Sequence, residues 1–246
     1  MNYWAILTGI EGNITAYDAV IADIKKQKYL VEDLYILGDI VGLNIDCKKL
    51  VERVSYPKQN ELKPKVCMGW WEEQCLILHG LTTTAEPTEL IAEYGMNAVK
   101  ILWDNVDRET VEWLRNLPFG FSELDCLLIH GSTLGVSDKL TPDTPPIQML
   151  DRLMRFGANN LFCGRSGLAF KYQLENGSVS SGVTKLGAEV GAIETTSSTQ
   201  TLRTPCQVIG VGNVGSLPGN ATYTLYNPNT NEVSFRTLRY SVLRNL

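Results

Sequence analysis

Apolar residues in the first two thirds of the chain fall into short continuous runs and into runs with helical spacing. The continuous runs predict buried strands at Tyr3–Thr8, Leu34–Leu37, Lys65–Met68, Asp125–His130 and Asn160–Cys163. Between them, apolar residues that recur every three or four positions predict helices at Thr15–Ile24, Cys47–Val54, Glu72–His79, Glu89–Val99, Arg108–Leu117 and Pro145–Phe156. Strands that alternate with helices are typical of an α/β protein with a mostly parallel sheet.

The pattern changes after Leu168, where short β-prone runs are separated by Gly, Asn and Pro turns. We predict strands at Leu168–Leu174, Gly177–Val183, Gln207–Gly210, Thr222–Asn227 and Glu232–Tyr240, in an antiparallel second sheet packed on the first. Residues 183–203 are rich in Ser, Thr and Gly, and we interpret them as a long, partly mobile excursion. No repeat or linker divides the chain, so we expect one domain over residues 1–246.

The predicted parallel strands end in polar or glycine-containing turns. These turns are Gly9–Asn13, Gly38–Gly42, Gly69–Glu73, His130–Ser132 and Gly164–Gly167. In open α/β folds, ligands bind outside the carboxyl ends of the strands, so Asp39 in the second turn is a candidate functional residue. The alternative is that Asp39 only caps its turn, and this stretch alone does not decide between the two.

Composition narrows the class of protein. Of the 246 residues, 44% are apolar and 20% charged, which is typical of a globular domain with a sizeable core. The net charge of −5 and the lack of a long basic run disfavour binding to nucleic acid. Six scattered Cys without CxxC spacing favour reduced thiols over disulfides or a zinc site. With neither a signal peptide nor an apolar run long enough for a membrane span, we expect a soluble cytoplasmic protein.

Taken together, the turn motifs resemble a known family. In order and spacing, LTGIEGN, LYILGDIVG, CMGWWEE, LLIHGS and CGRSG are similar to the motifs of the calcineurin-like metallophosphoesterases, above all the compact bacterial and archaeal phosphodiesterase branch. The C-terminal segment that begins VGNVGSLPG resembles the closing hairpins of that branch. The resemblance implies an α/β fold, a two-sheet αββα sandwich, with two metal ions at the strand ends. In the family these ions polarise a phosphate ester and supply a hydroxide nucleophile.

Carried over position by position, the resemblance leaves few metal ligands. The family's first-strand Asp and His ligands align with Gly9 and Glu11, whereas its bridging Asp is present as Asp39. Its Asn ligand and the neighbouring catalytic His align with Trp70 and Trp71.

Of the motifs LLIHGS and CGRSG, only the first retains the family's His ligand. The single-His motif is present as His130, but the final His pair aligns with Arg165 and Gly167. Only Asp39 and His130 therefore match expected ligands, although Glu11 could still bind through a different atom. The resemblance assigns no catalytic residue at these positions.

These replacements predict a degenerate metal site. A guanidinium cannot lose its proton, so Arg165 would stand where a divalent cation belongs. We predict an ion pair of Arg165 with Asp39 or Glu11, and we expect Trp70 or Trp71 to fill part of the space; an exposed Trp that stacks on a ring is the alternative. No cofactor is expected. The weak alternative is one divalent ion (Mn, Fe, Zn or Mg) at Asp39, His130 and Glu11, joined by Glu72 or Glu73.

Three functions remain open. The first is a non-catalytic binding or regulatory protein with a metallophosphoesterase fold, and the second is a residual phosphoesterase that uses a single metal. The third is a binder of phosphate or a nucleotide-like ligand that does not hydrolyse it, with Arg165, His130, Asn13 and Trp70 as ligand-binding residues and with backbone N–H groups of the Gly9–Asn13 turn. A homodimer is the default expectation for the assembly, since two-fold dimers are the commonest oligomers.

Overall fold

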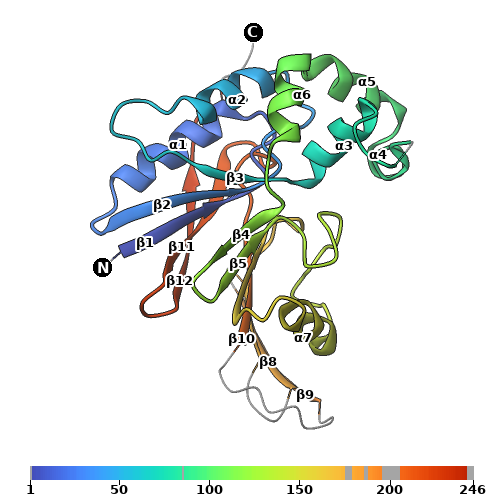
Figure 1. Cartoon of the computed structure of the whole chain (residues 1–246). Coiled ribbons are helices and arrows are strands. Elements are labelled where there is room, and N and C mark those ends of the chain that lie inside the picture. The colour runs from blue at the N-terminus through green and yellow to red at the C-terminus, as the bar shows by residue number, and fades with distance from the viewer. Residues whose placement is uncertain (1, 85, 175–178, 186–187, 196–205, 243–246) are drawn as a thin grey trace.

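Two mixed β-sheets stack face to face, and helices cover their outer faces (Figure 1). The computed structural model describes residues 2–84, 86–174, 179–185, 188–195 and 206–242. This architecture confirms the predicted two-sheet sandwich. Among the described residues, no helix combines the length and the hydropathy that crossing a bilayer requires.

The first sheet has five strands in the order β12-β11-β1-β2-β3. Its strands are β1 (Asn2–Leu7), β2 (Leu30–Leu37), β3 (Lys65–Cys67), β11 (Asn220–Asn227) and β12 (Glu232–Arg239). Strands β1, β2 and β3 run parallel, as their crossover helices require, while β11 and β12 add antiparallel.

The second sheet has seven strands in the order β4-β5-β6-β10-β7-β8-β9. Its strands are β4 (Gly120–Glu123), β5 (Cys126–Ile129), β6 (Asn160–Cys163), β7 (Ala169–Leu174), β8 (Val179–Lys185), β9 (Ala188–Thr195) and β10 (Cys206–Val211). Strands β5, β6 and β10 are parallel, and the others pair antiparallel.

The prediction that the late strands form a sheet of their own was wrong. Strands β11 and β12 pair beside β1, while β7 to β10 extend the sheet that β5 and β6 begin. The hydrophobic pattern of a strand shows which of its faces are buried, but it does not show which strand it pairs with. The sequence therefore gave no indication of which sheet each late strand would join. Strands β8 and β9 occupy part of the predicted 183–203 excursion, and residues 186–187 and 196–203 lie outside the described residues.

Helices α1 to α6 lie on the first sheet's side of the sandwich, and α7 lies beside the second sheet (Figure 1). The bounds of those on the first sheet's side are α1 (Ile14–Lys25), α2 (Cys47–Ser55), α3 (Trp70–Leu78), α4 (Thr88–Tyr94), α5 (Met96–Asn105) and α6 (Arg108–Arg115); α7 is Pro146–Met154. The single helix predicted over Glu89–Val99 is two helices, because Gly95 takes a φ of +79° between α4 and α5.

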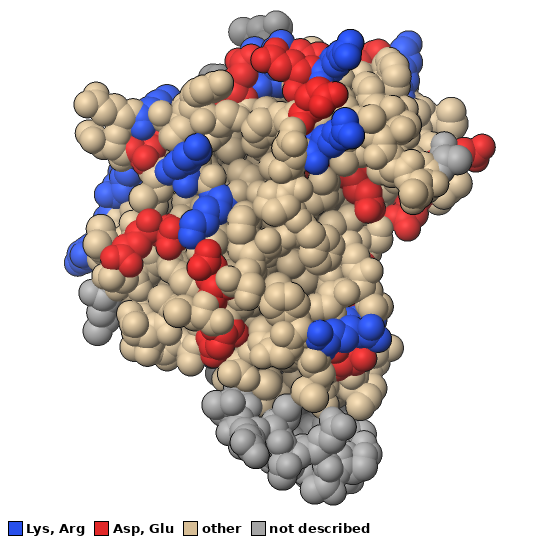
Figure 2. Space-filling view, viewed as in Figure 1, with Lys and Arg blue, Asp and Glu red and all other residues tan. Residues whose placement is uncertain are grey.

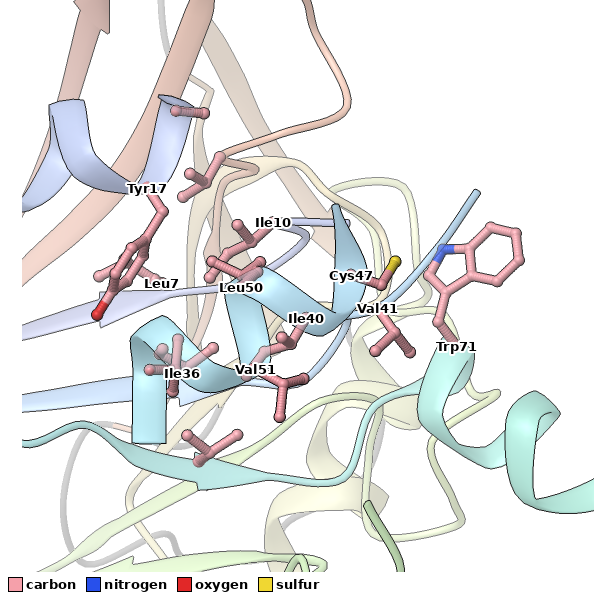
Figure 3. Close-up of a cluster of buried hydrophobic side chains, with 14 of the residues drawn as sticks. Leu7, Ile10, Tyr17, Ile36, Ile40, Val41, Cys47, Leu50, Val51 and Trp71 are labelled. Carbon is pink, nitrogen blue, oxygen red and sulfur yellow. The ribbon is translucent and has the colours of Figure 1, made fainter. Parts of the chain in front are cut away.

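Side chains of alternate residues on each strand enter different layers of the core. From β1, Ala5 and Leu7 pack against the helices, and Trp4 and Ile6 pack between the two sheets. Figure 3 shows part of the helix-side layer, where Ile36 of β2 meets Leu50 and Val51 of α2. On the face in Figure 2, Lys and Arg are interspersed with Asp and Glu over the helices, and the middle of the face carries few charges.

The ends of β2 and β3 approach each other closely. A Cβ on Gly69 would lie 2.3 Å from the Asp39 backbone nitrogen, and a Cβ on Gly38 would lie 2.3 Å from the Gly69 Cα. Gly38 also has a φ of +67°. Only residues without a side chain permit this packing, which brings the turn after β2 against the start of α3.

Gly69→Ala should therefore destabilise the protein by about 3–5 kcal/mol, since backbone atoms must move to admit the new methyl group. Gly80→Ala is the matched control, because Gly80 has a φ of +66° but no atom within 4 Å of its Cβ position. The control should cost only about 1 kcal/mol of backbone strain. Urea unfolding of both variants measures the difference, and equal losses would contradict the close approach.

Candidate functional site

The turns that follow β1, β2, β3, β5 and β6 meet at one edge of the sandwich. The backbone N–H groups of Ile10 and Glu11 donate to the Asp39 carbonyl at 2.8 and 2.9 Å, which joins the first two turns. The N–H groups of Gly164 and Arg165 both donate to the His130 carbonyl at 2.7 Å, which joins the last two. The predicted convergence of polar turns is therefore present.

His130 connects the two sheets and is completely buried. Its Nδ1 lies 2.7 Å from the Leu37 carbonyl oxygen, which can only accept, so Nδ1 carries the proton. In the neutral ring Nε2 is then an acceptor, and it lies 3.3 Å from Asp39 Oδ2. Burial lowers the pKa of His130 to about 4, so the ring is neutral at physiological pH.

Asp39 lies near the start of the turn after β2 and has a φ of +55°, in the left-handed region that non-glycine residues rarely adopt. Its Oδ1 accepts a hydrogen bond from the Trp71 backbone N–H at 2.9 Å, and its Oδ2 faces His130. Burial raises the pKa of Asp39, although the Trp71 hydrogen bond and the Arg165 charge oppose this rise. Because His130 Nε2 carries no proton, it donates no hydrogen bond to Asp39, and the two acceptors face each other at 3.3 Å.

Glu72, on the first turn of α3, is a completely buried carboxylate beside Asp39. It accepts hydrogen bonds from the backbone N–H groups of Asp39, Ile40 and Val41 at 2.7, 2.7 and 3.0 Å. Burial and the Asp39 charge raise the pKa of Glu72, and these N–H groups oppose the rise. The carboxylate therefore serves as the acceptor for a turn that has no other way to pair these buried donors.

Glu11 and Asn213 share the space next to Gly9. A Cβ on Gly9 would lie 2.2 Å from Asn213 Nδ2, and a Cβ on Gly167 would lie 3.5 Å from the same atom. Burial and the Asp39 charge raise the pKa of Glu11 to about 7, and a hydrogen bond with Asn213 opposes the rise. Asn213 thus occupies the volume between the two glycines that align with metal ligands.

Arg165 does not form the predicted ion pair with Asp39 or Glu11. Its Nη2 lies 2.9 Å from Glu93 Oε2, and its guanidinium carbon lies 4.3 Å from the centre of the Trp70 ring. No ion-pair contact within 4 Å joins it to Asp39 or Glu11 among the described residues, although its charge lowers the pKa of both. The prediction failed because Glu93, brought in by α4, offers a partly exposed carboxylate that costs less to pair.

The two Trp residues fill the core, as the first interpretation held. Trp70 and Trp71 are 0% and 2% exposed, so neither offers a stacking face to a ligand. Their rings are 5.0 Å apart and both contact the Tyr94 ring of α4. Trp70 Nε1 donates to Glu89 Oε2 at 2.9 Å, which satisfies its only polar atom.

Asn13 and the turn before it have their hydrogen-bonding groups in use. Asn13 Oδ1 caps α1 by accepting from the Ala16 N–H at 3.0 Å, and its Nδ2 donates to the Gly215 carbonyl and the Tyr240 hydroxyl. The N–H groups from Gly9 to Asn13 all donate to backbone carbonyls. Because His130 Nε2 is an acceptor as well, the anion cradle predicted from these groups is not formed.

Comparison with solved structures identifies the fold. A metallophosphoesterase from Sphaerobacter thermophilus matches with a TM-score of 0.67 and 18% identity, over 97% of this chain and 89% of that one. The chain has the metallophosphoesterase fold. A cold-active protein-tyrosine phosphatase of a psychrophilic Shewanella (TM-score 0.45, 15% identity, 74% of this chain and 77% of that one) is too distant to support an inference. No protein-family model and no curated protein matches the sequence.

The metallophosphoesterase fold implies divalent metals, and the residues at its strand ends do not fit a two-metal centre. Asp39 Oδ2 and His130 Nε2 converge, at a separation that two ligands of one ion can have. In the part of the chain that the structure describes, no group of three or more His, Cys, Asp or Glu could hold a metal ion. Two metals need more converging donors than this pair supplies.

Sequence reasoning missed three residues of this metallophosphoesterase-fold site. Asn213 lies in the loop after β10, Glu93 lies on α4, and Glu72 was considered only as a metal ligand. The sequence gives no periodic signal for any of them, because each acts through a contact with a distant turn. The one available clue was the presence of glycines at positions 9 and 167, which leaves volume that some other side chain must fill.

Glu72→Gln should lower the free energy of unfolding by about 2–4 kcal/mol, because one carboxamide oxygen cannot accept three N–H groups and its amide would face a donor. Glu73→Gln is the matched control, since this neighbouring carboxylate makes none of these contacts and should change stability by less than about 1 kcal/mol. Urea unfolding measures both. Similar values for the two variants would show that the turn does not depend on Glu72.

Glu11→Gln should give a stability gain that depends on pH. The folded protein keeps the Glu11 proton up to a pKa of about 7, against 4.5 without burial, so wild-type stability falls as pH rises through this window. Gln does not titrate, so the free energy of unfolding of the variant should exceed that of wild type by up to about 3 kcal/mol above pH 7. Near pH 4 the two should differ little.

Thermal unfolding at pH 4, 6 and 8 checks this expectation, with Glu52→Gln on the exposed face of α2 as the control. A gain of equal size at every pH would contradict the raised pKa of Glu11.

Proposed function

We propose that this protein is a metallophosphoesterase-fold protein that does not assemble a dinuclear metal centre and acts as a non-catalytic binding or regulatory protein. The observation that carries the proposal is the position of Asn213. Its amide fills the place where a side chain at Gly9 would project, so Asn213 as placed and an acidic ligand at position 9 exclude each other. The position that aligns with the first metal ligand is thus closed by the chain itself.

The other replaced positions support the same function. Trp70 and Trp71 fill the space of two polar side chains with buried rings. Arg165 brings a permanent positive charge to the site, where it lowers the pKa of Asp39 and Glu11 as a cation would. The negative charge at the strand ends is therefore balanced without metal ions.

A residual phosphoesterase that uses one metal is the second candidate. It is favoured by one observation: His130 Nε2 is buried, has no hydrogen-bond partner among the described residues and faces Asp39 Oδ2. A neutral imidazole whose other nitrogen donates to a carbonyl is also the usual arrangement of a metal-bound His.

Metal analysis and an activity assay separate the two candidates. We expect purified protein to carry well under one equivalent of Mn, Fe or Zn by mass spectrometry, and to show no turnover of bis-p-nitrophenyl phosphate in Mn²⁺ above the buffer rate. Because a ligand that binds only the folded state raises the melting temperature, Mn²⁺ should leave that temperature unchanged.

Asp39→Asn is the control variant, since it removes the carboxylate that either candidate metal site would need. Turnover with Mn²⁺ that Asp39→Asn abolishes would overturn the proposal in favour of the single-metal enzyme. Two equivalents of bound metal would overturn both candidates.

A further inference from the structure

Two cations hold one carboxylate at the edge of the site. Arg165, in the turn after β6, contacts Glu93 Oε2 through Nη2 at 2.9 Å. Lys139, in the loop before α7, places its Nζ 3.6 Å from Glu93 Oε1. The two oxygens of Glu93 thus face two different cations, which is the arrangement that a terminal phosphate or carboxylate would also satisfy.

Arg165 has binding capacity that Glu93 does not use. Its side chain is 10% exposed, and its Nε is buried with no hydrogen-bond partner among the described residues. The Trp70 ring lies against its guanidinium and limits its rotation. Glu93 contacts the Arg165 guanidinium through one oxygen and leaves the buried Nε donor unpaired. A ligand that offers a second acceptor oxygen to this guanidinium would therefore be favoured over Glu93.

The neighbouring carboxylates have other partners. Glu72 accepts from backbone N–H groups, Asp39 accepts from the Trp71 N–H, and Glu11 is bonded to Asn213. Glu93 is 39% exposed, so its side chain can turn into solvent without disturbing them. Helix α4 would keep its place, because Glu89 accepts from both Trp70 Nε1 and Ser137 Oγ at 2.9 Å.

We propose that Arg165 and Lys139 form a binding site for the oxyanion group of an exogenous ligand, a terminal phosphate or carboxylate, and that Glu93 occupies this site as an internal competitor. The inference rests on the proposed function, because it gives the non-catalytic site a class of ligand. No bond is made or broken: the ligand displaces Glu93, and the two cations exchange one anion for another.

Glu93→Gln removes the competing charge and should expose the site. When an internal competitor occupies a site about nine tenths of the time, its removal raises the apparent affinity about tenfold, and we expect a gain of this order for inorganic phosphate. At about ten times the dissociation constant, phosphate should raise the melting temperature of the variant by about 3–5 °C. Glu86→Gln, an exposed residue just before α4, should respond as wild type does.

The titrations use inorganic phosphate and succinate as probes, at constant ionic strength and with EDTA present. A response to phosphate alone supports the site and assigns a phosphoryl ligand; a response to both, or to succinate alone, supports it and assigns a carboxylate as an accepted ligand. No gain with either probe in folded Glu93→Gln would overturn the proposal.

Second-site variants test where the anion binds. Adding Arg165→Gln to Glu93→Gln should abolish the gain, and adding Lys139→Gln should reduce it several-fold. Lys139 is 47% exposed, so this variant remains informative if loss of Arg165 from above Trp70 prevents folding. A gain that survives both second-site changes would place the anion elsewhere and refute the proposal.

The outcome stays separate from that of the proposed function. Because EDTA removes metals during the titrations, a metal-bound phosphate cannot produce the response. Metal analysis of the purified protein before EDTA is added tests the proposed function independently, whatever the anion titrations give.

Discussion

Burial of the Glu72 carboxylate is the interaction on which the strand-end site depends. The turn after β2 directs three consecutive N–H groups inward, and Asp39 can start it only in a left-handed conformation. Without an acceptor, each buried N–H would cost about 1–3 kcal/mol. The carboxylate of Glu72 pairs all three, and Gly69 makes room for it, since a Cβ there would lie 2.4 Å from Glu72 Oε2.

The position of Asp39 follows from this contact. Once Glu72 holds the turn, the Asp39 carboxylate is left between the start of α3 and the second sheet, where Trp71 N–H and His130 are its neighbours. His130 is held in turn by the Leu37 carbonyl on β2. The buried polar contacts of Glu72, Asp39 and His130 therefore connect α3, the turn after β2 and the end of β5, and they position the two sheets relative to each other at this edge. The apolar layers pack the rest of the two sheets together.

Burial raises the pKa values of Asp39, Glu11 and Glu72, and groups of the chain itself oppose this rise. The Trp71 backbone N–H donates to Asp39, Asn213 bonds Glu11, and backbone N–H groups of the turn after β2 donate to Glu72. The positive charge of Arg165 lowers the pKa of both Asp39 and Glu11. Each buried carboxylate is thus stabilised by contacts that lie close to it in the fold.

The alternation of strands and helices predicted the convergence of the turns, because parallel strands end at the same edge of a sheet. The two-sheet sandwich and the choice of His130 came from the resemblance to the metallophosphoesterases, whereas Asp39 was also indicated by its place after a buried strand. The structure brings Asp39 and His130 within 3.3 Å of each other. The partner of Arg165 was not predictable: Glu93 lies on α4, whose separation from α5 depends on Gly95. The allocation of β11 and β12 to the first sheet was missed for a similar reason, since pairing is decided by contacts between segments.

The filled site is held by contacts that depend on one another. An acidic side chain at position 9 would collide with Asn213, whose Oδ1 also accepts the Ser216 N–H at 2.8 Å and so fixes the loop after β10. Polar replacements of Trp70 would remove the surface on which Arg165 rests and the donor that holds Glu89. The strand-end turns also place Ile10, Ile40 and Val41 in the apolar layer beneath the helices. The site and the core are therefore built from the same turns, so a change at one affects the packing of the other.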